Sequence, residues 1–571
     1  MSSENATEQQ RYDLVVRGGR VIDGTGLPAY VADIGVIDGR IVSIARLGDD
    51  AVALAHAVVD ANGMLVMPGF IDVHTHYDPQ LHFEATASPA SWHGVTTVIT
   101  GNCGFTIAPS KPEDVSWLLA MLSRVEGMPP AALDEGVDFA GGGVGALLDG
   151  LDGRIAVNAA VFVGHSAVRR YVMGDDAQTR DASNTEITAM QELVRPAMRE
   201  GAIGFSSSQL EIHQAHNGLP VPSNLASPEE VVALATVLAE FDHGVIEFIA
   251  WSFLDGYDAD DRALVRSLAL RSGKPVDLGP VFLSAASPEA WRDVIDFVDE
   301  AARDGLRLHP QYAVHRGGAF FTLDNTFLFD EVTPLLDALT QEEPKRSEVL
   351  RDPTTRAAIK EALEIPGSFP LRPEITSVYA VHRPEHEHWV GRTLSDLVEE
   401  RGGHYLDVFL DVALDDDLLT TWFVQPLSER GGNEVTANFI SNPMLLPGAS
   451  DGGAHVTSFV GADYTTRLLT EWVPHHFTLE EAVRKLTAVP AAIHGIHDRG
   501  TLRPGAWADI VVADPDQLAV GETRWATDFP GASERLVSDA EGYRAVIVNG
   551  VVILDDGEPT GARPGHALRF G

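Results

Sequence analysis

Two histidines, His74 and His76, end an apolar run in the segment VMPGFIDVHTHYDP. Residues i and i+2 of a β-strand point to the same side, so both imidazoles can reach one metal ion. Pro68 and Gly69 mark the entry to this strand. An isolated H-x-H pattern is a weak signal because surface histidines are common. Its place at the end of a strand, after a strand-rich N-terminal region, favours a metal site.

Two more residues have side chains of a type that can bind metal ions. Asp451 lies in the Gly-rich segment GASDGGAH, and Cys103 in GNCGF is the only cysteine of the chain. Imidazole, carboxylate and thiolate suit zinc first, although iron, cobalt and manganese also bind such sets. Taken alone, an aspartate among glycines such as Asp451 is typical of a turn, and a lone cysteine such as Cys103 is typical of a small buried apolar residue. Their role therefore depends on a fold that brings them to the histidines.

The elements that must position these residues alternate in type between about residues 67 and 499. Helical patterns separate β-rich apolar runs, which are GVTTVITGN, RIAVNAAVFVGH, GAIGFSSS, GVIEFIAWSF, PVDLGPVFL, LRLHPQYAVH and MLLPGASDGG. This alternation predicts an α/β fold, a (β/α)8 TIM-like barrel with its site at the carboxyl ends of the strands. An open doubly wound sheet is the alternative, but no G-x-G-x-x-G follows an early strand.

Short strands bounded by turn residues occupy both ends of the chain, in residues 1–66 and 500–571. Two half-sheets so far apart in sequence can pair only if the residues between them fold compactly with their ends close together. We therefore expect a small β-sandwich built from both chain ends. A charged stretch rich in proline and aromatic residues, 315–372, breaks the barrel pattern and predicts a helical lid insertion over the barrel mouth.

Composition argues against several classes of partner. The 571 residues carry 83 acidic against 41 basic side chains, a formal net charge of −42 that repels nucleic acid and anionic membranes. There is no signal-peptide pattern and no apolar run of about 18 residues. A lone cysteine excludes intrachain disulfides and favours a reducing, cytoplasmic location. The sequence leaves homo-oligomerisation open.

The segment PGFIDVHTH resembles the first-strand signature of the amidohydrolase superfamily. Further segments resemble its N-acyl-D-amino-acid deacylase (D-aminoacylase) branch, namely GVTTVITGNCGFTIAPS, FVGHSAVRRYVMG, GAIGFSSS, SDGGAH and AVRKLTAVPAAIHGIHDRGTLRPGAWADIVVADP. The resemblance runs from near Leu14 to near Arg569. It implies a metal-dependent hydrolase that uses activated water to cleave the C–N bond of a small-molecule amide, such as an N-acyl amino acid.

The resemblance also implies roles for single residues. His74, His76 and Asp451 would hold one Zn2+ ion, and Asp451 would take a proton from the attacking water and return it to the leaving nitrogen. Cys103 matches the cysteine that this branch uses as a metal ligand where many relatives use a carbamylated lysine. The fourth-strand candidate GAIGFSSS contains no lysine, which agrees with that substitution.

One departure from the pattern concerns the second metal ion. In this branch, a histidine after the fifth strand and another after the sixth hold a second zinc ion together with the cysteine. The corresponding segments GVIEFIAWSF and PVDLGPVFL contain no histidine. Glu247 in the first of them could substitute, although a glutamate at a strand end is as often an ion-pair partner. We therefore expect one zinc ion and a substrate that is not the usual one of the family.

Six further residues are candidates for substrate binding: His165, His213, His216, His309, Arg316 and Arg467. His165 ends the third strand, where the branch also has a histidine, and is expected near the pocket floor. For the other three histidines a structural or surface role is the alternative. The two arginines could bind a substrate carboxylate, because a guanidinium suits a planar anion. Their alternative is an ordinary surface position.

Two other functions remain open. The first is a mononuclear amidohydrolase that acts on a cyclic amide, a lactone or a peptide-like substrate, and a substrate panel separates it from a deacylase. The second is a catalytically silent barrel used as a scaffold. The H-x-H pair, the cysteine and SDGGAH weigh against a scaffold, because a chain without catalysis has little reason to keep them all.

Overall fold

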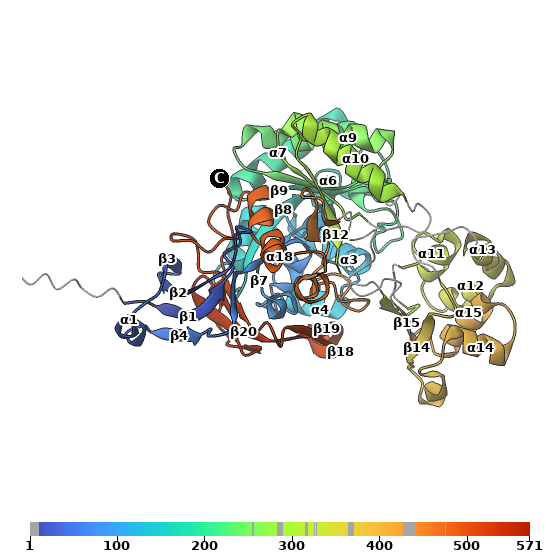
Figure 1. Ribbon diagram of the computed structural model, residues 1–571. Coiled ribbons are helices and arrows are strands. Elements are labelled where there is room, and N and C mark those ends of the chain that lie inside the picture. The colour runs from blue at the N-terminus through green and yellow to red at the C-terminus, as the bar shows by residue number, and fades with distance from the viewer. Residues whose placement is uncertain are drawn as a thin grey trace, which may run out of the picture.

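The structure is a computed structural model. It describes residues 11–253, 256–281, 289–314, 318–324, 326, 328–363, 371–425, 440–473 and 475–571. Figure 1 shows three parts: a central barrel, a sheet from the two ends of the chain at its lower left, and an insertion at its right. Within these residues, no helix has the length and apolar character needed to cross a membrane.

Eight parallel strands form the barrel, and their order in the sheet follows the sequence. They are β6 (Phe70–Thr75), β7 (Val95–Thr100), β8 (Asn158–Gly164), β9 (Gly204–Ser208), β10 (Val245–Ile249), β11 (Val276–Leu278), β12 (Leu308–Ala313) and β16 (Leu446–Gly448). A parallel bridge between Thr75 and Gly452 brings the last strand beside the first, so the barrel is nearly closed. The predicted (β/α)8 TIM-like barrel is confirmed. These strands are buried on both faces, which explains their continuous apolar runs.

Helices cover the outside of the barrel (Figure 1). They are α3 (Val115–Val125), α5 (Val144–Leu151), α6 (His165–Met173), α7 (Asn184–Glu200), α8 (Pro228–Thr236), α9 (Ala259–Ser272), α10 (Ala290–Arg303), α18 (Leu479–Leu486) and α19 (Ala488–Ile493). Local sequence sets their ends. Helix α7 begins with a capping box between Ser183 and Glu186, and it ends at Gly201 with φ 113°. Shorter helices are α1 (Asp49–Ala53), α2 (Tyr77–Gln80), α4 (Pro130–Gly136) and α17 (Tyr464–Arg467).

Strands from both chain ends form one sheet, in the order β22-β21-β20-β17-β5-β1-β2-β3 with β4 beside β1. They are β1 (Leu14–Val21), β2 (Tyr30–Ile37), β3 (Arg40–Ala45), β4 (Ala57–Asp60), β5 (Leu65–Pro68), β17 (Ile510–Ala513), β20 (Tyr543–Val548), β21 (Val551–Asp555) and β22 (Glu558–Pro559). Strand β17 pairs antiparallel with β5, with Val511 opposite Met67. The expected pairing of the two ends is therefore confirmed.

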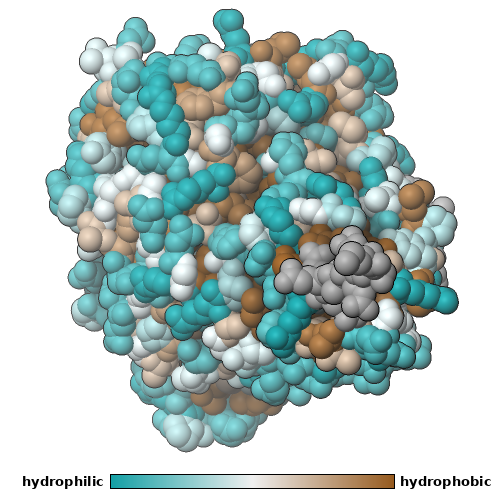
Figure 2. Space-filling model, turned by 90° about the vertical axis from the view of Figure 1, so that its left-hand side faces the viewer, coloured by the Kyte–Doolittle hydropathy of each residue, from teal (hydrophilic) through white to brown (hydrophobic). Residues whose placement is uncertain are grey.

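A hairpin of β18 (Ala519–Phe529) and β19 (Ser533–Glu541) accompanies this sheet. Figure 2 looks at the side of the molecule where the sheet lies, and shows mostly hydrophilic side chains with hydrophobic ones scattered between them. Such a surface agrees with the composition, in which acidic residues outnumber basic ones two to one.

The insertion between β12 and β16 is a subdomain with its own hydrophobic core, centred on Phe409 and Trp422. Its elements are β13 (Ala319–Phe321), α11 (Thr333–Leu339), α12 (Lys345–Arg351), α13 (Pro353–Leu363), β14 (Thr376–Ala380), α14 (Leu394–Arg401), α15 (Tyr405–Asp415) and β15 (Thr421–Val424). The sequence pattern placed the end of the insertion at residue 372. The subdomain continues to Val424, because α14, α15 and β15 complete the core and the sheet β13-β15-β14.

Candidate metal centre

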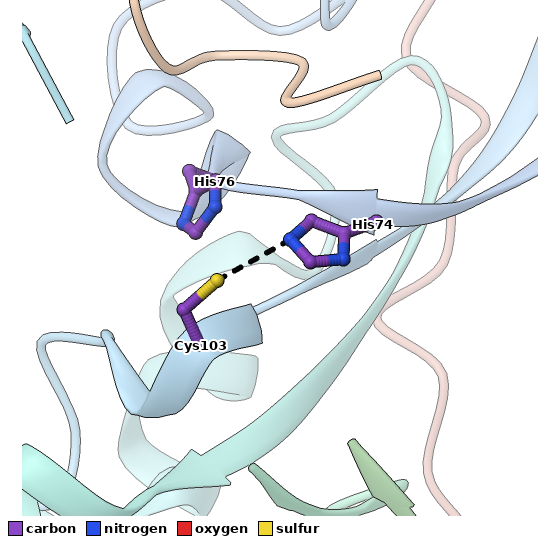
Figure 3. Close-up of side chains that lie close together, drawn as sticks. All are labelled: His74, His76 and Cys103. Atoms are coloured by element: carbon purple, nitrogen blue, oxygen red, sulfur yellow. Dashed lines mark hydrogen bonds between the residues drawn. The ribbon is translucent and has the colours of Figure 1, made fainter. Parts of the chain in front are cut away.

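His74, His76 and Cys103 lie together at the carboxyl ends of the first two barrel strands (Figure 3). All three are buried, and their ligand atoms lie within 4.8 Å of one another. His74 Nε2 is 3.3 Å from Cys103 Sγ. A zinc ion with bonds of about 2.0–2.3 Å holds neighbouring tetrahedral ligand atoms about 3.4–3.6 Å apart. The spacing of the two atoms therefore suits ligands of one ion.

A tight turn after β7 presents Cys103 to the histidines. Cys103 itself has φ 58°, a left-handed conformation that costs about 1–3 kcal/mol in a residue other than glycine. The side-chain amide of Asn102 donates to the carbonyl oxygens of Thr75 (3.1 Å) and Ile99 (2.9 Å). The turn is thus anchored to the ends of both strands, which keeps the thiol opposite the imidazoles.

Asp451 approaches the same point from the loop after β16. Its Oδ1 atom is 3.4 Å from His74 Nε2 and 4.0 Å from His76 Nε2. Ser450 fixes this loop, because its hydroxyl donates to Asp72 Oδ2 (2.7 Å) and to the carbonyl oxygen of His74 (3.0 Å). The structure brings together the four side chains that the sequence indicated as metal ligands.

The donor set fits a divalent cation. The Nε2 atoms of His74 and His76 both face Asp451 Oδ1, and that of His74 also faces Cys103 Sγ. Burial, followed by the nearby carboxylates of Glu247, Glu126 and Asp451, raises the pKa of the Cys103 thiol. Those carboxylates lie in a low-dielectric site, where a bound cation would balance their charge and stabilise the thiolate. Two nitrogens, one sulfur and one oxygen are a typical zinc set.

Glu247 on β10 is a close neighbour of Cys103. Its Oε2 atom accepts a hydrogen bond from the Cys103 backbone N–H (2.7 Å), and its buried Oε1 atom has no hydrogen-bond partner among the described residues. No histidine occurs in the sequence between His243 and His309, so neither β10 nor β11 nor the loops that follow them can supply one. Glu247 thus places a carboxylate beside Cys103, on the strand where the resemblance implies a histidine.

A cavity of about 150 Å³ opens beside these residues. One wall is apolar, and the side chains that form it are Val125, Leu210, Ile212, Ile249, Phe253 and Pro280. Polar lining comes from His213, Glu126, His455, Asp330 and Asp451, next to the histidine and cysteine cluster. Among the described residues, the lining contains neither lysine nor arginine. The cavity therefore joins an apolar surface to a negatively charged one at the candidate metal centre.

Comparison with known proteins places this arrangement in a family. The family described as "Amidohydrolase family" matches residues 57–554, which is most of the chain. The chain belongs to the amidohydrolase family. It is 30% identical to a D-aminoacylase from Alcaligenes xylosoxydans xylosoxydans over 98% of either chain. It is 28% identical to an N-acyl-D-glutamate deacylase of the same organism, over 98% of this chain and 97% of the other.

Solved structures of deacylases are also similar to this chain over almost its whole length. An N-acyl-D-glutamate deacylase from Bordetella bronchiseptica, complexed with zinc and a phosphonate that mimics the tetrahedral intermediate, has 25% identity and a TM-score of 0.66. A D-aminoacylase with a binuclear metal centre has 26% identity and a TM-score of 0.65. Both comparisons cover 98% of this chain and 100% of the other. The protein is accordingly a metal-dependent amidohydrolase that acts on carbon–nitrogen bonds other than peptide bonds.

Of the residues expected to bind substrate, the described part of the amidohydrolase brings His213 to the cavity. Ser208 Oγ lies 2.9 Å from His213 Nδ1, and burial lowers the pKa of His213 to about 3, so its imidazole is neutral. His165 is buried elsewhere, with its two ring nitrogens bonded to Ser207 Oγ (2.8 Å) and Glu230 Oε1 (2.9 Å). That ring links the start of α6 to β9 and α8, which is a structural role.

Three of the remaining candidates, His309, His216 and Arg467, lie away from the cavity lining. His309 is the second residue of β12, so it stands at the end of the barrel opposite the metal cluster. His216 packs edge-on against Trp117, and Arg467 forms ion pairs within its own helical segment. Arg316 lies outside the described residues. A sequence pattern predicts in which strand or loop a histidine or arginine lies. It does not predict whether that side chain faces the cavity.

Two cavity residues, Glu126 and His455, were not among the sequence candidates. His455 Nε2 is 3.5 Å from Glu126 Oε2, and Glu126 Oε1 is 3.7 Å from His76 Nδ1. His455 belongs to the segment SDGGAH, four residues after Asp451, so the motif itself could have indicated that His455 lies near the metal centre. Glu126 follows a helix with no distinctive neighbours, and its role emerges only from the fold.

Proposed function

We propose that this amidohydrolase cleaves the amide bond of a small N-acyl amino acid or a closely related amide, with one zinc ion held by His74, His76, Cys103 and Asp451. The convergence of these side chains on one point beside a cavity carries the proposal. A divalent cation bound there lowers the pKa of a water molecule and polarises the carbonyl group.

Asp451 is the residue best placed to move protons. Its side chain is 27% exposed, whereas those of His74 and His76 are 2% and 1% exposed, so its carboxylate faces the cavity more than they do. A carboxylate in this position accepts a proton from the attacking water and returns it to the leaving nitrogen, and such acid–base help contributes about 10²–10⁴-fold to rate. The two histidines, without this exposure, serve to hold the cation.

Support for a single ion comes from β10 and β11. Glu247 on β10 bonds the Cys103 backbone, and Asp277 on β11 lies 3.1 Å from His494 Nε2 and accepts from Gln311 (2.9 Å). Neither strand supplies an imidazole to a second site. We therefore propose one ion per chain, in contrast to the D-aminoacylase with a binuclear centre.

The cavity wall suggests the kind of group that is bound. Its apolar side chains, contributed by the ends of α3 and β10 and by the loops after β9, β10 and β11, suit an apolar acyl chain or side chain of the substrate. We propose that the acyl group or the amino-acid side chain of the substrate is apolar, unlike the side chains named for the aspartate and glutamate deacylases among the relatives. A thiol ligand persists most easily in a reducing compartment, so we also propose a cytoplasmic location.

Metal analysis with a substrate panel tests the proposal. We expect about one equivalent of zinc per chain in the wild type, none in the His74→Ala/His76→Ala variant, and an unchanged content in the His475→Ala/His476→Ala control, whose histidines are exposed. The panel contains N-acetyl and longer N-acyl D- and L-amino acids, cyclic amides and lactones. Two equivalents would contradict the single ion, and a zinc-loaded protein that releases no amine from any N-acyl substrate would contradict the reaction.

A further inference from the structure

The Glu126 carboxylate lies between two imidazoles at the cavity. The residue is 3% exposed, and its two oxygen atoms face different rings, Oε1 towards His76 Nδ1 and Oε2 towards His455 Nε2. His76 presents its other nitrogen, Nε2, towards Asp451. The ring of this ligand therefore stands between the metal position and Glu126, the usual place of a carboxylate that orients a metal-binding histidine.

The backbone holds His455 against the same glutamate. The His455 N–H donates to the carbonyl oxygen of Glu126 at 2.5 Å. Asp451 and His455 have φ 47° and 51°, so two non-glycine residues of one short loop adopt the left-handed conformation. Such strain of about 1–3 kcal/mol per residue persists where the surroundings fix it, as often at functional sites. The loop is thus built to present Asp451 and His455 in a set relation to Glu126.

In the hydrolysis of an amide, a hydrogen-bond donor beside the cation further stabilises the carbonyl oxygen, which gains negative charge as the carbonyl is attacked. Apart from the ligand cluster, the described cavity lining offers two side chains that carry N–H groups, His213 and His455. His213 is tied to Ser208 and lies edge-on to Phe105, on the loop after β9. His455 shares a loop with Asp451 and a carboxylate with His76, so its position is coupled to the metal centre.

We propose that His455 is a catalytic residue whose Nε2–H group donates a hydrogen bond to the scissile carbonyl oxygen. Glu126, whose Oε2 atom lies 3.5 Å from Nε2, is the positioning residue that orients this N–H group and the ligand His76 together. This inference rests on the proposed amide hydrolysis. Glu126 thereby links the orientation of the cation to the placement of the substrate. Loss of its carboxylate affects both, whereas loss of the His455 imidazole affects the substrate alone.

Three variants separate these roles: His455→Leu, His455→Asn and Glu126→Gln. We expect His455→Leu to retain its zinc affinity and lower kcat by about 10²–10³-fold, the usual effect of removing one oxyanion donor. His455→Asn keeps an N–H donor and tolerates a positive φ, so it should recover part of that loss. Glu126→Gln should raise the Kd for zinc by about tenfold or more, as for other groups that orient ligands, and lower kcat as well.

A double variant tests whether the pair acts as a unit. Because Glu126 acts on the substrate through His455, Glu126→Gln/His455→Leu saturated with zinc should lose little more kcat than zinc-saturated His455→Leu. Glu230→Gln is the matched control, a buried glutamate that also bonds a histidine, His165, away from the cavity lining. This control should lower the thermal midpoint and leave kcat per bound zinc unchanged.

The outcomes distinguish this inference from the proposed function. If the wild type cleaves amides and His455→Leu keeps kcat within about threefold, the catalytic role of His455 is wrong while the hydrolase stands. If the zinc-loaded wild type cleaves no amide, the proposed function fails, and the catalytic role with it. The zinc affinities of Glu126→Gln and His455→Leu still decide, without any substrate, whether Glu126 orients His76: equal affinities would overturn that role.

Discussion

At the scale of single residues, Cys103 connects the metal centre to the folding of the barrel. Its thiol faces His74 Nε2 at 3.3 Å, while its backbone N–H is bonded to Glu247. Burial and the surrounding carboxylates raise the pKa of the thiol, so the protonated form is favoured until a cation binds. Zinc binding should then release the proton of the thiol, and the affinity for zinc should rise with pH.

The single cysteine makes this ligand directly measurable. We expect the thiol of the zinc-depleted protein to react with a disulfide reagent at least tenfold faster than the thiol of the zinc-loaded protein, because a metal-bound thiolate is shielded. The Asp451→Asn variant, in which zinc binds less tightly, should show intermediate protection at limiting zinc. Equal reaction rates with and without zinc would show that Cys103 is not a ligand.

Local motifs made part of this site predictable. His74, His76, Cys103 and Asp451 each stand in a short segment with turn residues beside a strand, and the fold brings them together. Glu126 lies outside any such segment. It reaches the cavity because α3 ends beside the loop after β16, a contact between positions more than three hundred residues apart. Periodicity along one element carries no information about such a contact.

At the scale of elements, the insertion meets the barrel at the cavity. Arg124 at the end of α3 pairs with Asp330 of the insertion (2.6 Å), and Asp330 lines the cavity. All eight barrel strands were visible in the sequence, because parallel strands buried on both faces give continuous apolar runs. The end of the insertion was not visible, because α14, α15 and β15 repeat the same alternation of helix and strand as the barrel.

Asp330 gives this contact a defined pH dependence. Burial raises the pKa of Asp330 to about 6, although Arg124 acts in the opposite direction. Between its ordinary value of 3.8 and about 6, the folded protein holds a proton that the unfolded chain has lost. The contribution of this group therefore becomes less favourable as pH rises through that window. Relative to Asp330→Asn, which does not titrate, the wild type should lose stability from pH 4 to pH 6.

Urea unfolding of the zinc-depleted proteins at a series of pH values measures this difference. Asp417→Asn is the control, since Asp417 is an exposed acid of the same insertion whose pKa is lowered by Arg383. A lowered pKa places the titration of folded Asp417 at more acid pH than that of Asp330, so this variant should follow the wild type closely as pH rises through the window. Parallel pH profiles for the wild type and Asp330→Asn would contradict the raised pKa.

At the scale of the whole molecule, a buried polar network joins the terminal sheet to the barrel. Asp509, just before β17, accepts from the side chain of Asn158 on β8 (3.1 Å) and from the backbone N–H of Asn549 (2.8 Å). Arg499 bonds the same carboxylate, and the side chains of both charged residues are 3% exposed or less. The C-terminal strands of the sheet are therefore tied to β8 of the barrel by one charged cluster.

Replacing Asp509 by asparagine should destabilise the entire protein. The change keeps the shape of the side chain and leaves the buried Arg499 without its counter-charge, which costs about 3–5 kcal/mol. Because the network spans both parts, the unfolding midpoints of the sheet and the barrel should fall together, as hydrogen exchange at β17 and β8 would report. Asp498→Asn removes the neighbouring exposed ion pair with Arg40, and is expected to change the free energy of unfolding by less than about 1 kcal/mol. If β17 lost protection while β8 kept it, the terminal sheet would be an independent unit that the barrel does not need.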